Sequence, residues 1–349
     1  MRWLTFDGLG QRELDAWHRF RAGNPALDSP YFHPGFAAAV HNSGRTVHVA
    51  VDEDKTGEIR ALLPGHREGS VLRPVGWPGA DFQGPIVPAG KSFSPLGLLS
   101  GGVKSFEFDH LVDGVAEFEP WIRSRRVSPY VDVSGGLDGY LGRATKSGRD
   151  NISQARRRTS KAERELGPVK FQVDVVDEEL LRQLVELKRG QYRATGARDF
   201  FAEPDRLDLM HRLLHTRGRD FGGILSTLHA GDHLIAAHFG IRAGSVLHWW
   251  FPVYAPEHAK LAPGWMLLRE LVISAPALGI ERIDLGRGDD EYKRRAKTGE
   301  STVCQGIVTR SSSRLALRRL GDSVVATAKN SPLAPGLRRV VRGLRNLDR

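Results

Sequence analysis

Cysteine is nearly absent from this chain of 349 residues, which has a single one, Cys304. One cysteine excludes an internal disulfide and any metal site built from several thiolates. Since Cys304 lies in the strand-like run STVCQGIVT, we expect a small buried side chain there. Long apolar runs are missing too: no stretch approaches the roughly 18 residues of a membrane span, and the start MRWLTFDGLG lacks the apolar core of a signal peptide. We therefore expect a cytoplasmic protein.

The formal net charge is +10, but the excess of basic residues is concentrated in two segments. Residues 311–349 hold nine Lys and Arg against two Asp, and residues 143–170 hold nine against three acidic residues, so the remainder is slightly acidic. This distribution is a poor match for a broad nucleic-acid groove. Within the tail, residues 333–348 alternate an apolar stripe with an arginine stripe at helical spacing. That pattern predicts a basic amphipathic helix on a membrane surface, on a partner or on its own domain.

The length favours two compact domains and a tail, which we place at 1–142, 143–310 and 311–349. In the first domain, the pattern predicts a helix over 11–22 and strands over 46–51 and 59–66. The second begins with a helix-forming run that ends at Gly167-Pro168.

The remaining elements follow in a defined order. We expect a strand over 169–176, helices over 177–194 and 205–215, three antiparallel strands over 221–229, 233–242 and 245–254, a helix over 264–275, a strand over 280–286, a short helix containing EYKRRA and a strand over 301–309. This order predicts an α+β fold with one mixed central sheet flanked by helices.

One loop turns directly into an apolar helix, at Lys260-Leu-Ala-Pro-Gly-Trp-Met-Leu-Leu268. Pro263 suits a first helical turn, and Gly264 lets another group approach the backbone closely. The turn has no acidic residue and no Ser or Thr cap, so its N–H groups are left for an external anion such as a diphosphate. From these residues alone, an ordinary helix start is an equal alternative.

Several features in order, spanning about residues 150–309, resemble acyltransferases of the GNAT superfamily, of the CelD/BcsL type. They are RRRTSKAEREL, HLIAAHFG, LHWWFPVY, APG before a helix, LGIERIDLGRG and EYKRR. Ala262 stands where relatives commonly have serine, which removes a cap, and Pro276 shortens the helix. The family is similar to the FemABX transferases, which pair two GNAT-like domains. The resemblance therefore implies that residues 1–142 form a second, degenerate GNAT-like domain.

The resemblance implies an acyl-CoA donor, either acetyl-CoA or another acyl-CoA, and no metal. The donor would lie between splayed strands at 245–253 and 280–286, with its thioester oxygen held by backbone near Trp250 and Phe251. Its diphosphate would lie at the following helix. The implied donor-binding residues are Trp250, Phe251, Lys260, Pro263, Gly264, Trp265, Met266 and Leu267.

Candidate catalytic groups come from two places. Pairing across the Ala243-Gly244 turn puts His238 opposite Trp249, on one face with Phe251, which makes His238 the first choice for a base; a structural histidine is the alternative. His248 falls on the core face. Carboxylates and a Tyr-Lys pair near the expected thioester complete the set, with the lysine placed to stabilise developing negative charge: Asp284, Glu291, Tyr292 and Lys293. A zinc site at His229, His233 and His238 is rejected, because a hairpin turn separates the first two.

The acceptor would meet Trp249 and, at the helix between the domains, Arg156 and Arg157, although a solvated helix face is the simpler interpretation of these arginines. Three functions remain open. The first is acyl transfer from acyl-CoA to an amine or hydroxyl of a sugar or exopolysaccharide precursor. The second is a FemABX-like transferase that uses aminoacyl-tRNA and whose binding weakens with salt. The third is a GNAT-like module without catalysis in an envelope-building complex.

Overall fold

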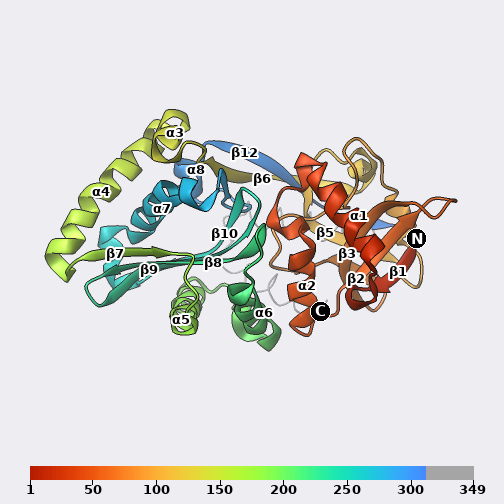
Figure 1. Cartoon of the computed structure of the whole chain (residues 1–349), viewed down its shortest axis with the longest axis horizontal. Coiled ribbons are helices and arrows are strands. Elements are labelled where there is room, and N and C mark those ends of the chain that lie inside the picture. The colour runs from red at the N-terminus through yellow and green to blue at the C-terminus, as the bar shows by residue number, and fades with distance from the viewer. Residues whose placement is uncertain (312–349) are drawn as a thin grey trace, which may run out of the picture.

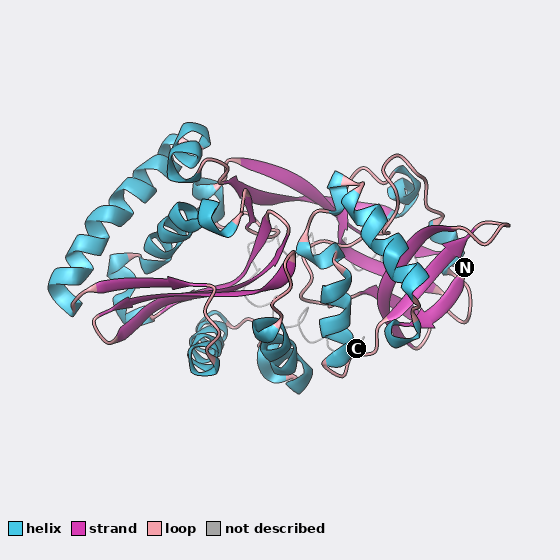
Figure 2. Cartoon of the chain, in the orientation of Figure 1, coloured by secondary structure: helices cyan, strands magenta, loops and turns pink. Residues whose placement is uncertain are grey.

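The structure, a computed structural model, describes residues 1–311. Its strands form one mixed sheet of twelve, in the order β1-β2-β3-β4-β5-β12-β6-β11-β10-β9-β8-β7. Helices lie on both faces of this sheet (Figure 1), and the strands run as a continuous layer through the molecule (Figure 2). The mixed central sheet flanked by helices, expected from the sequence, is therefore confirmed.

The first part of the chain supplies six strands and two helices. They are β1 (Arg2–Thr5), α1 (Gln11–Ala22), α2 (Pro34–Asn42), β2 (His48–Glu53), β3 (Ile59–Glu68), β4 (Val71–Pro74), β5 (Ser105–Val112) and β6 (Ile122–Asp132). The predicted helix over 11–22 is confirmed, and the two predicted strands correspond to β2 and β3. Helices α1 and α2 cover one face of β1–β3 (Figure 1).

The second part contains every element that the pattern predicts. The elements are α3 (Gly136–Arg143), α4 (Lys146–Leu166), β7 (Val169–Val173), α5 (Glu178–Thr195), α6 (Pro204–His215), β8 (Phe221–Ala230), β9 (His233–Ala243), β10 (Val246–Tyr254), α7 (Pro263–Ser274), β11 (Arg282–Asp284), α8 (Glu291–Ala296) and β12 (Gly299–Thr309). The helix-forming run is broken once, because Thr145 leaves the helical region and caps α4 by accepting a hydrogen bond from Gly148 N, at 3.1 Å. Helix α7 ends at Ser274, two residues before Pro276, as a proline requires.

Two strands interleave the two parts of the chain. Strand β6 lies between β12 and β11, and pairs antiparallel with both. Strand β12, the last of the described chain, lies between β5 and β6. It carries Cys304, which is buried as expected. The centre of the sheet is thus built from segments that are far apart in the sequence.

The sheet has a core on each face. Helices α5 and α6 share a core with α1 and α2 below β8–β10, and α4 and α7 cover the opposite face of these strands (Figure 1). Helix α4 buries Ile152, Ala155 and Ala162 against α7. A third core, rich in phenylalanine, lies beside β5 and β12.

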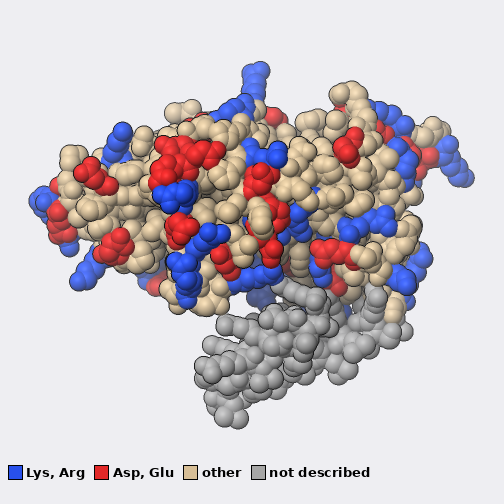
Figure 3. Space-filling view, turned by 90° about the horizontal axis from the view of Figure 1, so that it is seen from below, with Lys and Arg blue, Asp and Glu red and all other residues tan. Residues whose placement is uncertain are grey.

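No helix within residues 1–311 is both long and apolar enough to cross a bilayer. The amphipathic helix predicted over 333–348, and all of the basic tail after residue 311, lie outside the described residues. On the face seen in Figure 3, acidic and basic side chains are interspersed over the described part of the molecule.

Candidate functional site

A cavity of about 610 Å3 lies along β10, between the start of α7 and α5, and reaches the first part of the chain. It is lined from five directions: by β10, by the start of α7, by α8 and the loop before it, by α5, and by one residue of the β4–β5 loop. The residues that line it are Asp81, Lys188, Gln191, Trp249, Trp250, Pro252, Val253, Tyr254, Ala259, Ala262, Pro263, Gly264, Trp265, Leu267, Leu268, Leu285, Asp290, Tyr292 and Lys293.

Strands β10 and β11 separate at this cavity. They pair in parallel only where Val246–His248 faces Arg282–Asp284, although β10 continues to Tyr254. The slot expected between these strands therefore begins after His248. A β-bulge between His248 and Phe251 also changes the register of β10 against β9.

The hairpin turn and the bulge together correct two expectations about side chains. The turn is Gly244-Ser245 and not Ala243-Gly244, because Ala243 pairs with Val246; this shift and the inserted residue together pair His238 with Pro252 and not with Trp249. Phe251 does not share a face with His238, because the extra residue turns it into the core below the sheet, where its ring centre lies 5.1 Å from those of Phe200 and Phe201. A simple count of alternate residues across the hairpin could not include this inserted residue.

The start of α7 presents backbone to the cavity. Its N-cap, Ala262, has a left-handed φ of 46°, no side chain caps the first turn, and no acidic residue lies in it. A Cβ built on Gly264 would meet no atom within 4 Å, and its backbone is not left-handed. The fold therefore does not require glycine at this position, while the space above it belongs to the cavity. Such an open, uncapped turn can accept an anionic group.

The other residues expected near α7 divide into two groups. Pro263, Trp265 and Leu267 line the cavity with Gly264. Met266 is fully buried in the core between α7 and the sheet, and Lys260 is exposed on the turn before Ala262. The cavity lining thus includes four of the six residues that were expected in this segment.

Helix α8 brings Tyr292 and Lys293 to the cavity. Lys293 is 8% exposed, and its Nζ donates to the carbonyls of Gly286 at 3.3 Å and Arg287 at 3.0 Å and lies 3.5 Å from Asp290 Oδ2. These contacts fix the ammonium at the end of β11. Burial raises the pKa of Tyr292, so its phenol stays protonated at neutral pH and can donate a hydrogen bond.

The two predicted carboxylates lie outside the cavity lining. Asp284 is buried and faces Arg282, with Oδ1 at 3.0 Å from Nε, while Arg282 also holds both oxygens of Asp28. Burial raises the pKa of Asp284, and the Arg282 charge opposes that shift. Glu291 is exposed and pairs with Arg295. Both carboxylates are thus engaged in ion pairs.

His238 is fully buried behind the cavity wall. Its ring stacks on Trp249, with centroids 4.0 Å apart and planes 13° from parallel. Neither ring nitrogen has a hydrogen-bond partner among the described residues. Burial lowers the pKa of His238 to about 3, so the ring stays neutral and is a weak base at neutral pH. This position favours a structural role as support for Trp249.

Arg156 and Arg157 are exposed on α4, on the side away from the residues that pack on α7. They are not part of the cavity lining, so a contact with the acceptor would require a part of it to extend outside the cavity.

Helix α5 contributes a cavity residue that the sequence analysis did not identify. Lys188 donates from Nζ to the carbonyl of Pro252 on β10, at 3.0 Å. Burial, with the nearby charge of Lys293, lowers the pKa of Lys188 to about 8. A lysine on an amphipathic helix is typically a solvated side chain. Only the packing of α5 against β10 shows that Lys188 is enclosed.

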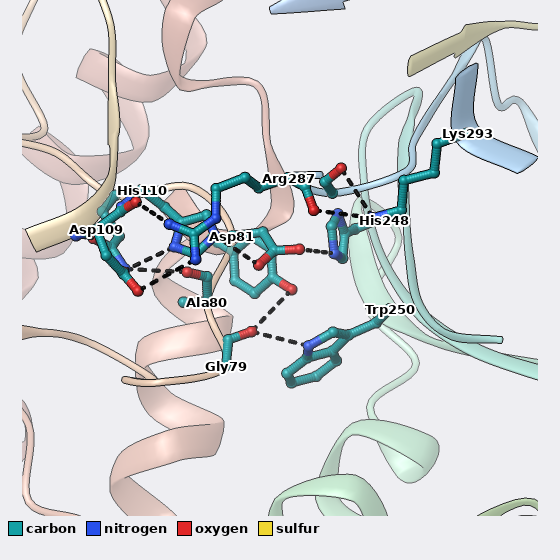
Figure 4. Close-up of polar contacts among 12 residues, drawn as sticks. Gly79, Ala80, Asp81, Asp109, His110, His248, Trp250, Arg287 and Lys293 are labelled. Carbon is teal, nitrogen blue, oxygen red and sulfur yellow. Dashed lines mark hydrogen bonds and ion pairs between the residues drawn. The ribbon is translucent and has the colours of Figure 1, made fainter. Parts of the chain in front are cut away.

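A second unexpected residue is Asp81, from the β4–β5 loop. Its Oδ2 lies 3.2 Å from His248 Nε2 and its Oδ1 lies 3.3 Å from His110 Nε2, as Figure 4 shows. Burial alone would raise the pKa of Asp81, but the His248 contact and the His110 charge outweigh it and hold that pKa below its usual range. Asp81 stands in the run WPGADFQGP, whose only sequence signal is a turn.

The family comparison concerns the second part of the chain, which supplies nearly all of the cavity lining. Residues 146–294 match the acetyltransferase (GNAT) domain family. The matched range begins at the first residue of α4 and ends inside α8, so it contains all the cavity residues except Asp81. No curated protein matches the chain significantly.

Several solved structures resemble the fold of this chain over nearly its whole length. FemX has 12% identity and a TM-score of 0.56, over 88% of this chain and 96% of that chain. A tandem GNAT protein from the clavulanic acid biosynthesis pathway has 12% identity and a TM-score of 0.52, over 89% and 98%. The C-terminal DUF2156 domain of a lysylphosphatidylglycerol synthetase from Agrobacterium fabrum has 13% identity and a TM-score of 0.53, over 89% of this chain and 96% of that chain. At such identities the likeness is one of fold.

Proposed function

We propose that this protein transfers an acyl group, most simply acetyl, from acyl-CoA to an amine or hydroxyl of a sugar or cell-envelope precursor. The observation that carries the proposal is the open first turn of α7 at Gly264, which faces a cavity beside the separated strands β10 and β11. The GNAT domain family supports the donor, and the CelD/BcsL resemblance supports the acceptor class.

In this proposal the diphosphate of CoA lies at the backbone of residues 262–267. Trp265 N already donates to Ala262 O and Pro263 has no N–H, so the Gly264 N–H and the positive end of the α7 dipole favour an anion there, and no acidic side chain opposes it. The pantetheine arm then follows the slot between β10 and β11. The thioester reaches the bulge at Trp250, where strand backbone is released from regular pairing and can donate to the carbonyl oxygen.

The acceptor nitrogen or oxygen attacks the thioester carbon, and negative charge develops on the carbonyl oxygen. Lys293 is fixed at the end of β11, where its ammonium can stabilise that charge. When the carbon–sulfur bond breaks, the protonated phenol of Tyr292 can donate a hydrogen bond to the leaving thiolate. Lys188, part of whose population is neutral near pH 8, can accept the proton that the acceptor loses.

A FemX-like function is the second candidate, because FemX and the lysylphosphatidylglycerol synthetase domain share the fold over both parts of the chain. In that case the donor would be an aminoacyl ester of tRNA, and the exposed Arg156 and Arg157 on α4 would contact RNA phosphates. Binding would then fall steeply with salt. A module without catalysis in an envelope-building complex would bind neither donor productively.

Calorimetric titration with acetyl-CoA tests the proposal. Gly264→Asp should reduce donor affinity about 100-fold or more, because a carboxylate there fills the cradle and repels phosphate, while the free space above the backbone leaves the fold intact. Gly142→Asp is the matched control, since that glycine, at the exposed end of α3, also has no atom within 4 Å of an added Cβ.

Three results would decide between the functions. Loss of binding in Gly264→Asp and normal binding in Gly142→Asp support the proposal. Equal binding by Gly264→Asp and the wild type would refute the diphosphate position. A wild type that binds no CoA ester but binds aminoacyl-tRNA in a salt-sensitive way would support the FemX-like function instead.

A further inference from the structure

The first part of the chain contributes one residue to the cavity lining, Asp81. The other charged residues of that lining are Lys188, Lys293 and Asp290, all from the second part. We propose that Asp81 is the acceptor-binding residue of the site and selects an acceptor whose reacting group is an amine. The amine enters as an ammonium, loses one proton to solvent and attacks as the neutral amine, whose next proton passes to Lys188. This inference rests on the proposed function, and it assigns to the first part of the chain a role in choosing the acceptor.

The loop that carries Asp81 is held in place by hydrogen bonds to the two residues before it. Trp250 Nε1 donates to Gly79 O at 2.9 Å, and Gln83 Nε2 donates to Ala80 O at 3.1 Å. A Cβ at Gly79 would lie 2.6 Å from the Phe200 ring, so the loop packs closely against the second part of the chain. A residue that only filled a surface turn would not require such anchoring from β10.

The Asp81 carboxylate is positioned by contacts on three sides. His248 and His110 face its two oxygens, and His110 Nδ1 in turn lies 2.8 Å from Asp109 Oδ1 (Figure 4). On the third side is Gly286, where an added Cβ would lie 2.3 Å from Asp81 Oδ2. Gly286 has a φ of 74°, and its carbonyl binds Lys293. The glycine therefore allows the carboxylate to approach the backbone that also fixes the catalytic lysine.

These contacts leave Asp81 able to bind a ligand. A carboxylate has about four lone-pair positions, and the two histidines face its oxygens at ion-pair distances of 3.2 and 3.3 Å, which leaves lone pairs for a ligand. Its side chain is 25% exposed, toward the cavity that it lines. The contacts also keep it ionised at neutral pH. An ionised, partly enclosed carboxylate attracts an ammonium and forms a charge-assisted hydrogen bond with it, whereas a neutral hydroxyl gains less.

The position also suits the reaction. Asp81 and Lys293 lie on either side of Gly286, so a nitrogen held by Asp81 is close to the end of β11, where the proposed oxyanion would be stabilised. Lys293 and the protonated fraction of Lys188 add positive charge to the same space, and Asp290 beside Lys293 offsets part of it. Asp81 lowers the remaining positive potential that a cationic acceptor would meet there.

Steady-state kinetics with acetyl-CoA as donor test the inference. The amine probes are glucosamine, lysine and putrescine, and glucose is the neutral twin of glucosamine. Transfer to at least one amine should exceed transfer to glucose. For the best amine, Asp81→Asn should raise KM about 10- to 100-fold and change kcat less, because the amide keeps the shape but loses the charge.

Asp109→Asn is the matched control. Asp109 faces the other nitrogen of His110 but does not line the cavity. We expect both variants to lose a similar amount of thermal stability, and only Asp81→Asn to lose affinity for the amine. A purely structural role for Asp81 would instead lower the melting temperature and kcat without the selective rise in KM.

The inference and the proposed function can fail separately. If calorimetry shows normal binding of acetyl-CoA to Asp81→Asn, but its KM for the amine is also normal, the inference alone is overturned. The inference would also be overturned if the wild type binds acetyl-CoA but transfers acetyl to none of the three amines, or if it prefers glucose. A wild type that binds no CoA ester would overturn the proposed function, and the inference with it.

Discussion

The two sides of the cavity are built in different ways. On the α7 side, the site consists of backbone: an uncapped helical turn and a glycine that the fold does not require. On the side of the β4–β5 loop, it consists of one carboxylate, which two histidines and a close glycine hold in place. A backbone site suits a constant group such as a diphosphate, and a side-chain site suits a group that differs between substrates.

This difference in construction explains why the α7 side could be predicted from the sequence and the Asp81 side could not. A helix start without a cap is a local pattern of adjacent residues, so it can be recognised in one segment. The carboxylate acquires its environment from residues far along the chain, since His248 is on β10 and Gly286 follows β11. If the two sides are also separate in function, variants on one side should change donor binding and variants on the other should change acceptor binding.

The largest effect should come from Lys293, which lies between the two sides. We expect Lys293→Ala to lower kcat about 100- to 1000-fold, because it removes the cation proposed to stabilise the oxyanion, while acetyl-CoA binds normally. Calorimetry and steady-state kinetics measure the two effects. Lys297→Ala, which removes a surface lysine paired with Glu300, is the control. A parallel loss of donor binding in Lys293→Ala would place this lysine on the donor side.

Lys188→Met should lower kcat/KM about tenfold, an intermediate effect, because it removes the group proposed to accept the proton of the acceptor. It should also remove the rise in kcat/KM with pH that is centred near pH 8. A rise centred near pH 8 that persists in the variant would contradict this role.

The same variant should change stability in a defined direction. The folded pKa of Lys188, about 8, lies below the unfolded value of 10.5, so the unfolded chain binds more protons between these values and stability rises with pH across them. Lys188→Met removes the cost of burying the ammonium, which is greatest below pH 8. We expect its melting temperature to rise by roughly 2–4 °C at pH 7 and by less at pH 10. Equal changes at both pH values would show that packing, and not charge, is responsible.

A smaller effect should follow from Trp250→Phe, which keeps a ring but removes the hydrogen bond from β10 to Gly79 O. The loss of about 1 kcal/mol of anchoring should loosen the Asp81 loop and raise the KM of the amine about fivefold, with little change in donor affinity. Trp121→Phe, in the separate core beside β12, is the control. A change confined to donor affinity would show that Trp250 belongs to the α7 side alone.

The smallest effect is expected for His238→Phe, which retains a ring against Trp249. Because burial already keeps His238 neutral, its removal should change kcat/KM less than about twofold at pH 6 to 9. The loss of a pH-dependent step in this variant would restore His238 as the general base that hairpin pairing suggested.

The sequence predicted the elements of the second part of the chain well, because each rests on local periodicity and local stop signals. Gly167 ends α4, and Asp177 caps α5 by accepting from Leu180 N, as residues of these types do. In the candidate site, Tyr292, Lys293 and the start of α7 do line one cavity, and their roles stay predictions.

Two kinds of feature could not be predicted. The bulge in β10 adds one residue to the strand, and this reverses the face of Phe251. Pro252, the next residue, indicates an irregular strand but does not show which residue is inserted. Asp81 and Lys188 become cavity residues only through tertiary contacts, with His248 and Pro252 respectively. Their local patterns, a turn and an amphipathic helix, are typical of solvated side chains.

The interleaving of β6 and β12 has a consequence for how the molecule is assembled during synthesis. Strands β5 and β6 leave the ribosome early, but the strand between them is made about 170 residues after β6 ends. Until then, both have an edge with unpaired backbone groups, and such edges invite pairing with other chains. Closing the sheet therefore depends on contacts of very long sequence separation, which form slowly. We expect β12 to act as the closing segment of folding, so that chains interrupted before Gly299 should aggregate or require chaperones.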